Sequence, residues 1–134
     1  MELRVVPVEY VPQIWDKVVG FLDKALQYSK GDYNIHHAQT YLSAGTWMLV
    51  IAEEAGSIRG AAAIQFFNRP TNRVAFVVAI GGRLISTPES LEDFKLILKA
   101  HGATTLEGAA RDSIARLWSR FGFNEKYKIM EVVL

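Results

Sequence analysis

Two adjacent histidines in this sequence have side chains suited to proton transfer. His36 and His37 follow Tyr33 closely in the chain. An imidazole titrates near neutrality, so each histidine is suited to accepting or releasing a proton. Adjacent residues on a helix point in different directions, so at most one of the two faces a given pocket. The alternative for each histidine is a surface or packing role.

Other kinds of active site are excluded by the residues present. The chain has no cysteine, which excludes disulfides, a thiolate zinc site and a cysteine nucleophile. No serine lies in the Gly-x-Ser-x-Gly context of a hydrolase, and no Gly-Lys-Ser/Thr triplet marks a phosphate-binding loop. Two histidines without a third ligand make a poor metal site, so we expect no metal.

Composition indicates one folded domain with little attraction for nucleic acid. The chain has 134 residues, of which 50% are hydrophobic, and a formal net charge of +1. We therefore expect a single domain, 1–134, with its own core. A basic ridge at Arg111, Arg116 and Arg120 is interpreted as the solvated face of a helix. No secretory signal or membrane-length apolar run is evident, so we expect a cytoplasmic protein without membrane contact.

Hydrophobic periodicity predicts that strands and helices alternate along the chain. The expected strands are 3–7, 46–52, 58–67, 73–80, 104–108 and 127–134. The expected helices are 11–29, 35–42, 88–101 and 112–121. The third helix has a clear start, with Ser86 or Thr87 as its cap, Pro88 in the first turn and Glu89 able to complete a capping box. The order β-α-α-β-β-β-α-β-α-β predicts an α/β (α+β) fold, a mixed sheet with helices on both faces.

The last predicted helix carries the most specific pattern. Ile114, Leu117, Trp118 and Phe121 recur at helical spacing, and Gly122 stands where a left-handed cap is expected. This pattern resembles the Asn-x-x-Ala-x-x-Leu-Tyr-x-x-x-Gly-Phe signature of the GCN5-related N-acetyltransferase (GNAT) superfamily. Together with the element order, the resemblance covers essentially the whole chain. It implies a GNAT-like fold that transfers an acetyl group from acetyl-CoA to an amine on a small molecule or peptide.

The resemblance also implies where acetyl-CoA binds. The pyrophosphate cradle of relatives corresponds to Gly81, Gly82, Arg83 and Leu84, although Pro88 removes a donor and Glu89 places a negative charge near the helix start. The alternative is that the two glycines form a plain turn between strand and helix. The remaining expected coenzyme contacts are Val78, Ile80 and Phe121. The strand residues serve equally well as plain core.

The groups expected to move protons depart from the family pattern. Trp118 stands where relatives often have a tyrosine, and an indole N–H donates a hydrogen bond but is not a usable acid. The resemblance makes Glu107 and His37 the candidate bases, with Tyr33 and His36 in the acceptor pocket. The alternative for Glu107 is a solvated or capping carboxylate before the helix that begins near Asp112.

A second class of function stays open beside the enzyme. The chain also resembles small, cysteine-free GNAT-like proteins carried by tailed bacteriophages, some of them associated with virions. This reading implies a catalytically inert binding or structural protein, in the host cytoplasm or the virion. Its partner would be a virion assembly. A homodimer stays open for either function, because the apolar last strand can pair across a two-fold axis if its edge is exposed.

Overall fold

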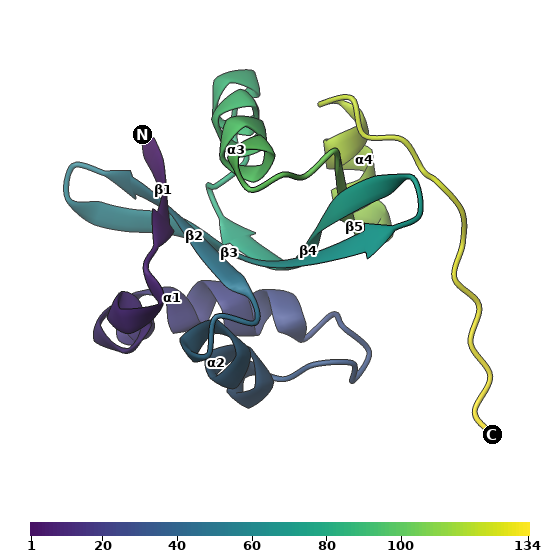
Figure 1. Cartoon of the computed structure of the whole chain (residues 1–134), viewed down its shortest axis with the longest axis horizontal. Helices are drawn as coiled ribbons and strands as arrows, with labels where there is room; N and C mark the ends of the chain where they lie inside the picture. The colour runs from purple at the N-terminus through teal and green to yellow at the C-terminus, as the bar shows by residue number, and fades with distance from the viewer.

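The computed structural model describes residues 1–134 as one twisted sheet with helices on both faces (Figure 1). The strands are β1 (Glu2–Val6), β2 (Met48–Glu54), β3 (Ser57–Arg69), β4 (Asn72–Gly82) and β5 (Thr105–Gly108). The helices are η1 (Val8–Tyr10), α1 (Val11–Leu26), α2 (Ile35–Ser43), α3 (Pro88–Ala100) and α4 (Asp112–Ser119). The mixed α/β fold expected from the sequence is confirmed. No helix combines the length and the apolar composition that crossing a bilayer requires.

The strands follow one another across the sheet in the order β1-β2-β3-β4-β5. All neighbouring pairs are antiparallel except the last, because α3 carries the chain back and makes β5 parallel to β4. β5 is therefore an edge strand that is bonded on one side only.

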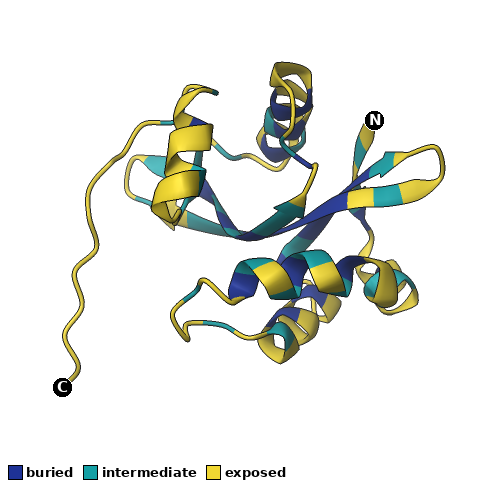
Figure 2. Cartoon of the chain, turned by 180° about the vertical axis from the view of Figure 1, so that it is seen from behind, coloured by how far each residue is buried: buried dark blue, intermediate teal, exposed yellow.

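Two hydrophobic clusters cover the two faces of the sheet. Helices α1 and α2 pack on one face, and α3 packs on the other. The alternation along β2 divides its residues between them, with Leu49 and Ile51 towards α1 and Val50 and Ala52 towards α3. Because both faces are covered, the central strands are apolar almost throughout, and they form the dark blue centre of Figure 2.

The start of α3 is closed by its own side chains. Thr87 is the cap, and its hydroxyl accepts a hydrogen bond from the Ser90 main-chain N–H at 3.1 Å. Ser90, rather than the expected Glu89, completes the capping box, and its side chain is buried at 5% exposure. The short, buried serine suits this position because its hydroxyl satisfies main-chain donors that water does not reach.

The last part of the chain differs from the sequence prediction. Helix α4 ends near Gly122, whose φ of +94° fits the expected glycine cap. The predicted strand 127–134 is wrong, because these residues pair with no strand and extend away from the body (Figure 1). A run of apolar, β-branched residues forms a strand only where it can pair with the edge of a sheet. Of the predicted stripe on α4, only Trp118 is buried.

We predict that Trp118→Ala lowers the free energy of unfolding by roughly 3 to 5 kcal/mol, because it empties the space between α4 and β5. Trp118 is 7% exposed, whereas its neighbour Leu117 is 40% exposed. Leu117→Ala is the matched control and should change stability by no more than about 0.5 kcal/mol. Urea denaturation measures both. Equal losses in the two variants would contradict this packing.

Candidate active site

A crevice opens where β4 and β5 separate. The two strands pair only from Val74 with Thr105 to Val77 with Gly108. A bulge at the next residue, Val78, shifts the register of β4 against β3. Bulges bend and twist a strand, so this one turns the second half of β4 away from β5. A cavity of about 640 Å³ lies in the gap.

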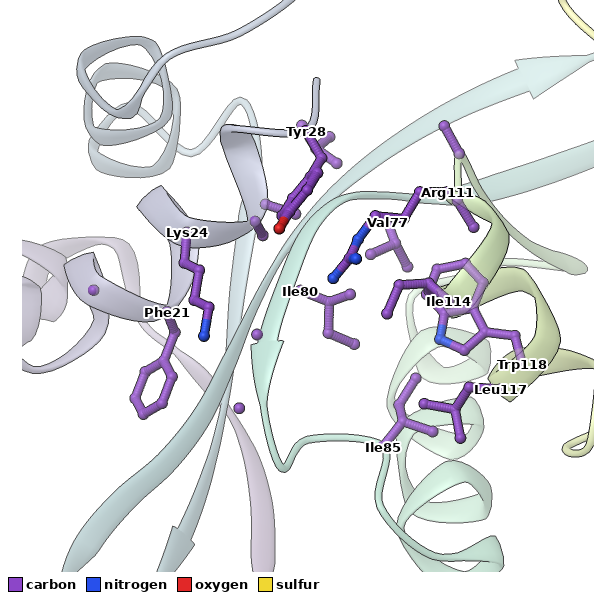
Figure 3. Close-up of a pocket in the computed structure, with 18 of the residues that line it drawn as sticks. Phe21, Lys24, Tyr28, Val77, Ile80, Ile85, Arg111, Ile114, Leu117 and Trp118 are labelled. Carbon is purple, nitrogen blue, oxygen red and sulfur yellow. The ribbon is translucent and has the colours of Figure 1, made fainter. Parts of the chain in front are cut away.

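Three elements form the walls of this cavity. Figure 3 shows side chains from α1, β4 and α4 pointing into it from different directions. The second half of β4 forms the floor, from Val77 to Gly82, and α1 forms one wall. The residues after β5 and one side of α4 form the other wall, which consists of Ala109, Ala110, Arg111, Ile114, Leu117 and Trp118.

The floor offers main-chain hydrogen-bonding groups. β4 continues to pair with β3 as far as Gly82, but no strand pairs with its other edge beyond Val77. The N–H and C=O groups that point to this edge therefore face the crevice without a strand partner. Such groups bind an extended ligand in the way that they would bind another strand.

The two glycines at the end of β4 are required by close packing. A Cβ at Gly81 would lie 2.5 Å from the main-chain oxygen of Phe21 on α1. Gly82 has a φ of +71°, and a Cβ there would meet the carbonyl oxygen of Arg59 on β3. The glycine pair therefore lets β4 pass between α1 and β3. This supports the plain-turn interpretation, although both glycines also line the cavity.

The loop that leads from β4 to α3 has only a few free donors. The Arg83 N–H donates to the Arg59 carbonyl at 2.9 Å, and the N–H groups of Ser86 and Thr87 donate to the Ser90 hydroxyl, both at 3.0 Å. Outside the helices and strands, the main-chain donors without a protein acceptor in this loop are those of Leu84 and Ile85. The capping side chains thus accept hydrogen bonds from main-chain N–H groups that a phosphate would otherwise bind at this helix start.

The structure divides the expected coenzyme residues into two groups. Val78, Ile80, Gly81 and Gly82 all line the cavity. The others do not: Arg83 is exposed beside it, the Leu84 side chain is fully buried in the core under α3, and Phe121 lies past the end of α4.

Glu107 was expected to be a base at the crevice, but its side chain does not line the cavity. Its carboxylate binds the Arg69 guanidinium through both oxygens, one at 2.9 Å, and also lies 3.4 Å from Lys126 Nζ. The hydrogen bonds and positive charge of Arg69 lower the pKa of Glu107 from its ordinary value. A carboxylate held in its ionised form by two cations is a poor proton acceptor.

The expected acceptor-pocket residues also lie outside the cavity. His37 belongs to the capping box of α2, where its Nδ1 accepts from the Asn34 N–H at 3.1 Å. His36 is exposed on the same helix, and the Tyr33 ring packs edge-on against Trp47 with centroids 5.2 Å apart. No three metal-binding side chains come close enough to hold an ion.

The polar side chains that do line the cavity were not singled out for this site from the sequence. They are Asp16, Lys17 and Lys24 on α1, Tyr28 just after it, and Arg111 before α4. Figure 3 shows Lys24, Tyr28 and Arg111 converging on the cavity. The Arg111 guanidinium lies 4.0 Å from the centre of the Tyr28 ring and so links the two walls by a cation–π contact.

A signal for the α1 residues exists in the sequence. Asp16, Gly20, Lys24 and Tyr28 recur at intervals of one helical turn, beside the apolar stripe that packs α1 on the sheet. The repeat marks one face of the helix predicted at 11–29, but only the tertiary structure brings that face to the crevice. Three cations against one carboxylate make the polar part of the lining positive overall, which favours anionic ligands.

Solved structures with this fold include several acetyltransferases or proteins described as such. A tetramutant of the BH1408 protein from Bacillus halodurans matches with a TM-score of 0.68 and 17% identity, covering 100% of both chains. An aminoglycoside acetyltransferase from an uncultured soil metagenomic sample, in complex with sisomicin, matches with a TM-score of 0.69 and 9% identity, covering 99% of this chain and 95% of that one. A predicted acetyltransferase from Clostridium acetobutylicum, with acetyl-CoA, matches with a TM-score of 0.65 and 16% identity, covering 98% and 95%.

These matches show that the chain has the GNAT fold over its full length. No protein-family model matches the sequence, and no curated protein does. At such low identities the likeness defines the fold, and the chemistry has to be argued from the site itself.

We predict that Gly81→Ala destabilises the protein by roughly 1 to 3 kcal/mol, because the added methyl group forces α1 away from β4. Gly20, on the cavity wall in α1, has no atom within 4 Å of a built Cβ. Gly20→Ala is the matched control and should stabilise by about 1 kcal/mol through helix propensity. Thermal and chemical denaturation measure both changes. Stabilisation by Gly81→Ala would show that α1 does not press on this glycine.

Proposed function

We propose that the protein is an acetyl-CoA-dependent N-acetyltransferase, with the crevice between β4 and β5 holding the acetylated arm of the coenzyme. The observation that carries the proposal is the separation of these strands after Val77, which leaves one edge of β4 unpaired along a cavity. The GNAT fold and the acetyl-CoA in one matching structure support it.

The cavity suits an extended, amide-containing ligand. Its volume of about 640 Å³ falls in the range of roughly 300 to 1,000 Å³ that is usual for ligand pockets. Pantetheine is a flexible chain with two amide groups, and the free edge of β4 supplies the donors and acceptors that such amides need. Ile80, Ile114 and Trp118 supply apolar contacts around it.

The reaction joins the acceptor nitrogen to the acetyl carbon as the carbon–sulfur bond breaks. A main-chain N–H on the free β4 edge is the group available to stabilise the negative charge that develops on the thioester oxygen. Trp118 can donate a hydrogen bond near the sulfur, but its indole does not release the proton. Water therefore protonates the departing thiolate, which is a good leaving group.

The acceptor amine enters from the α1 wall. Asp16 is the group there that can hold an ammonium ion and accept a proton from it, directly or through water, and the Tyr28 hydroxyl can accept a hydrogen bond from it. They replace Glu107 and His37 in this role, because neither of those residues lines the cavity. The acceptor, a small molecule or a peptide, is otherwise undefined.

A second candidate is an inert binding or structural protein with this fold, such as a virion component. The specific observation that favours it is the closed start of α3, where Ser90 takes the donors of Ser86 and Thr87. Glu89, in the first turn, adds a negative charge that repels a phosphate. On this account the protein binds acetyl-CoA weakly or not at all.

We predict that acetyl-CoA raises the melting temperature, with the RT ln(1 + [L]/Kd) dependence of a native-state ligand. Ala109→Trp, which fills the crevice, should abolish the rise. Ala115→Trp adds the same ring to an exposed alanine of α4 outside the cavity, and should leave the rise intact. No stabilisation of the wild type at millimolar acetyl-CoA would favour the inert protein.

A further inference from the structure

Two cationic side chains face the cavity without a partner in the protein. Lys24 lies on α1 and Arg111 lies before α4, and both line the cavity (Figure 3). The ion pairs of the chain involve neither of them. The lysine and arginine side chains that donate hydrogen bonds within the protein are those of Arg4, Arg69, Arg73, Lys95 and Lys126. Lys24 and Arg111 are therefore free to bind an anion that enters the cavity.

The contact with Tyr28 prepares Arg111 for such an anion. The guanidinium lies over the Tyr28 ring, 4.0 Å from its centre, and this contact holds the group at the cavity although no hydrogen bond does. A guanidinium carries its N–H donors in a rigid fork, and the ring covers only one side of it. The remaining donors match the paired oxygens of a carboxylate or a phosphate.

Arg111 and Tyr28 lie at the end of the crevice where β4 and β5 separate. Arg111 follows closely after Gly108, which pairs with Val77. In Figure 3 the side chains of Arg111 and Tyr28 are at the same end as Val77, whereas Ile85 is at the other end. The main-chain donors that the loop before α3 leaves free are at that other end, where they can meet the phosphates of a coenzyme. Arg111 thus lies away from the coenzyme's phosphates, on the acceptor side.

A carboxylate lies farther along the same wall. Asp16 is the only acidic residue that lines the cavity. It precedes Lys24 by two turns of α1, about 12 Å along the helix axis, and forms no ion pair with it. The α1 wall therefore presents a negative group towards one end and a positive group towards the other. This arrangement matches a molecule that has both an ammonium group and an anionic group.

We infer that the acceptor is a small amine that also carries an anionic group, a carboxylate or a phosphate, and that Lys24 and Arg111 bind this group. The inference rests on the proposed function, because it concerns the second substrate of the same crevice. Binding the anion at the Val77 end leaves the amine directed along α1 towards Asp16, beside the unpaired edge of β4. An acceptor with several ammonium groups is disfavoured, because the two cations repel it.

Titration with inorganic phosphate in the presence of saturating coenzyme A tests the anion site without catalysis. Coenzyme A occupies the sites of its own phosphates, so inorganic phosphate that still binds reports the acceptor side. We expect the main-chain amide signals of Lys24, Tyr28 and Arg111 to shift and saturate. No shift at tens of millimolar phosphate would overturn the inference. A shift that coenzyme A abolishes would overturn it too, because the cations would then serve the coenzyme.

The same titration separates the inference from the proposed function. If coenzyme A alone shifts no amide signal of the crevice, the proposed function fails, and the assignment of an acceptor fails with it. If coenzyme A shifts the amides of β4 but phosphate then shifts none near Arg111, only the inference fails.

Substitution of the two cations tests which side chains bind the anion. Lys24→Met and Arg111→Met remove the charge and keep an unbranched side chain, so each should weaken phosphate binding by about tenfold or more. Arg116→Met is the matched control, because Arg116 is exposed on α4 and does not line the cavity. It should leave phosphate binding unchanged. Equal weakening by all three substitutions would show unspecific attraction to a basic surface and would overturn the inference.

Initial rates of coenzyme A release with matched amines test the acceptor class. Phosphoethanolamine is compared with ethanolamine, and L-alanine with its amide. We expect kcat/KM to be about tenfold higher for the anionic member of a pair, and Arg111→Met to remove this preference while the KM for acetyl-CoA stays unchanged. Measurable transfer without that preference would overturn the inference. No transfer to any of these amines would count against transfer activity, and the phosphate titration would still decide the anion site.

Discussion

Strand β4 has a paired strand along its whole length on one side but along only part of its length on the other, and the site depends on this asymmetry. It pairs with β3 along its whole length, to Gly82, but with β5 only as far as Val77. The bulge at Val78 turns it, and the close approach of α1 and β3 at the two glycines fixes where it ends. The crevice is therefore a consequence of strand pairing and packing, and it does not depend on any one polar side chain.

The same constraint separates the coenzyme-binding groups of the crevice from its polar side chains. Main-chain groups of β4 face the cavity whatever the side chains are, so a coenzyme arm can be held by backbone alone. The side chains on α1, just after it and before α4, among them Lys24, Tyr28 and Arg111, then select which acceptor binds beside the coenzyme. At the start of α3 the main-chain donors are not left free, because the side chains of Thr87 and Ser90 accept hydrogen bonds from them.

Elements with strong local signals could be predicted from the sequence. The amphipathic stripe of α1, the proline in the first turn of α3 and the glycine after α4 are each read from residues that are near one another in the sequence, and the structure contains all three. The strand predicted at 127–134 failed because its composition says nothing of whether an edge is within reach. Pairing is a long-range property, and in the structure no strand pairs with these residues.

The site was harder to predict than the fold, for a related reason. Val78, Ile80, Gly81 and Gly82 were identified because the resemblance fixes the strand that lines the crevice. Glu107 and His37 were assigned from residue type, but each is committed to a neighbour, Arg69 in one case and Asn34 in the other. Arg69 lies 38 residues from Glu107 in the sequence, and Asn34 binds His37 only because a helix begins there. The type and spacing of Glu107 and His37 reveal neither contact.

Chemical shifts of the main-chain amides during a titration with acetyl-CoA test the central claim most directly. The account predicts that the amides of 78–82 and 109–111 shift together and saturate, while those of His36 and His37 on α2 stay unchanged. Shifts that avoid β4, or no shifts at millimolar acetyl-CoA, would contradict a coenzyme site between β4 and β5.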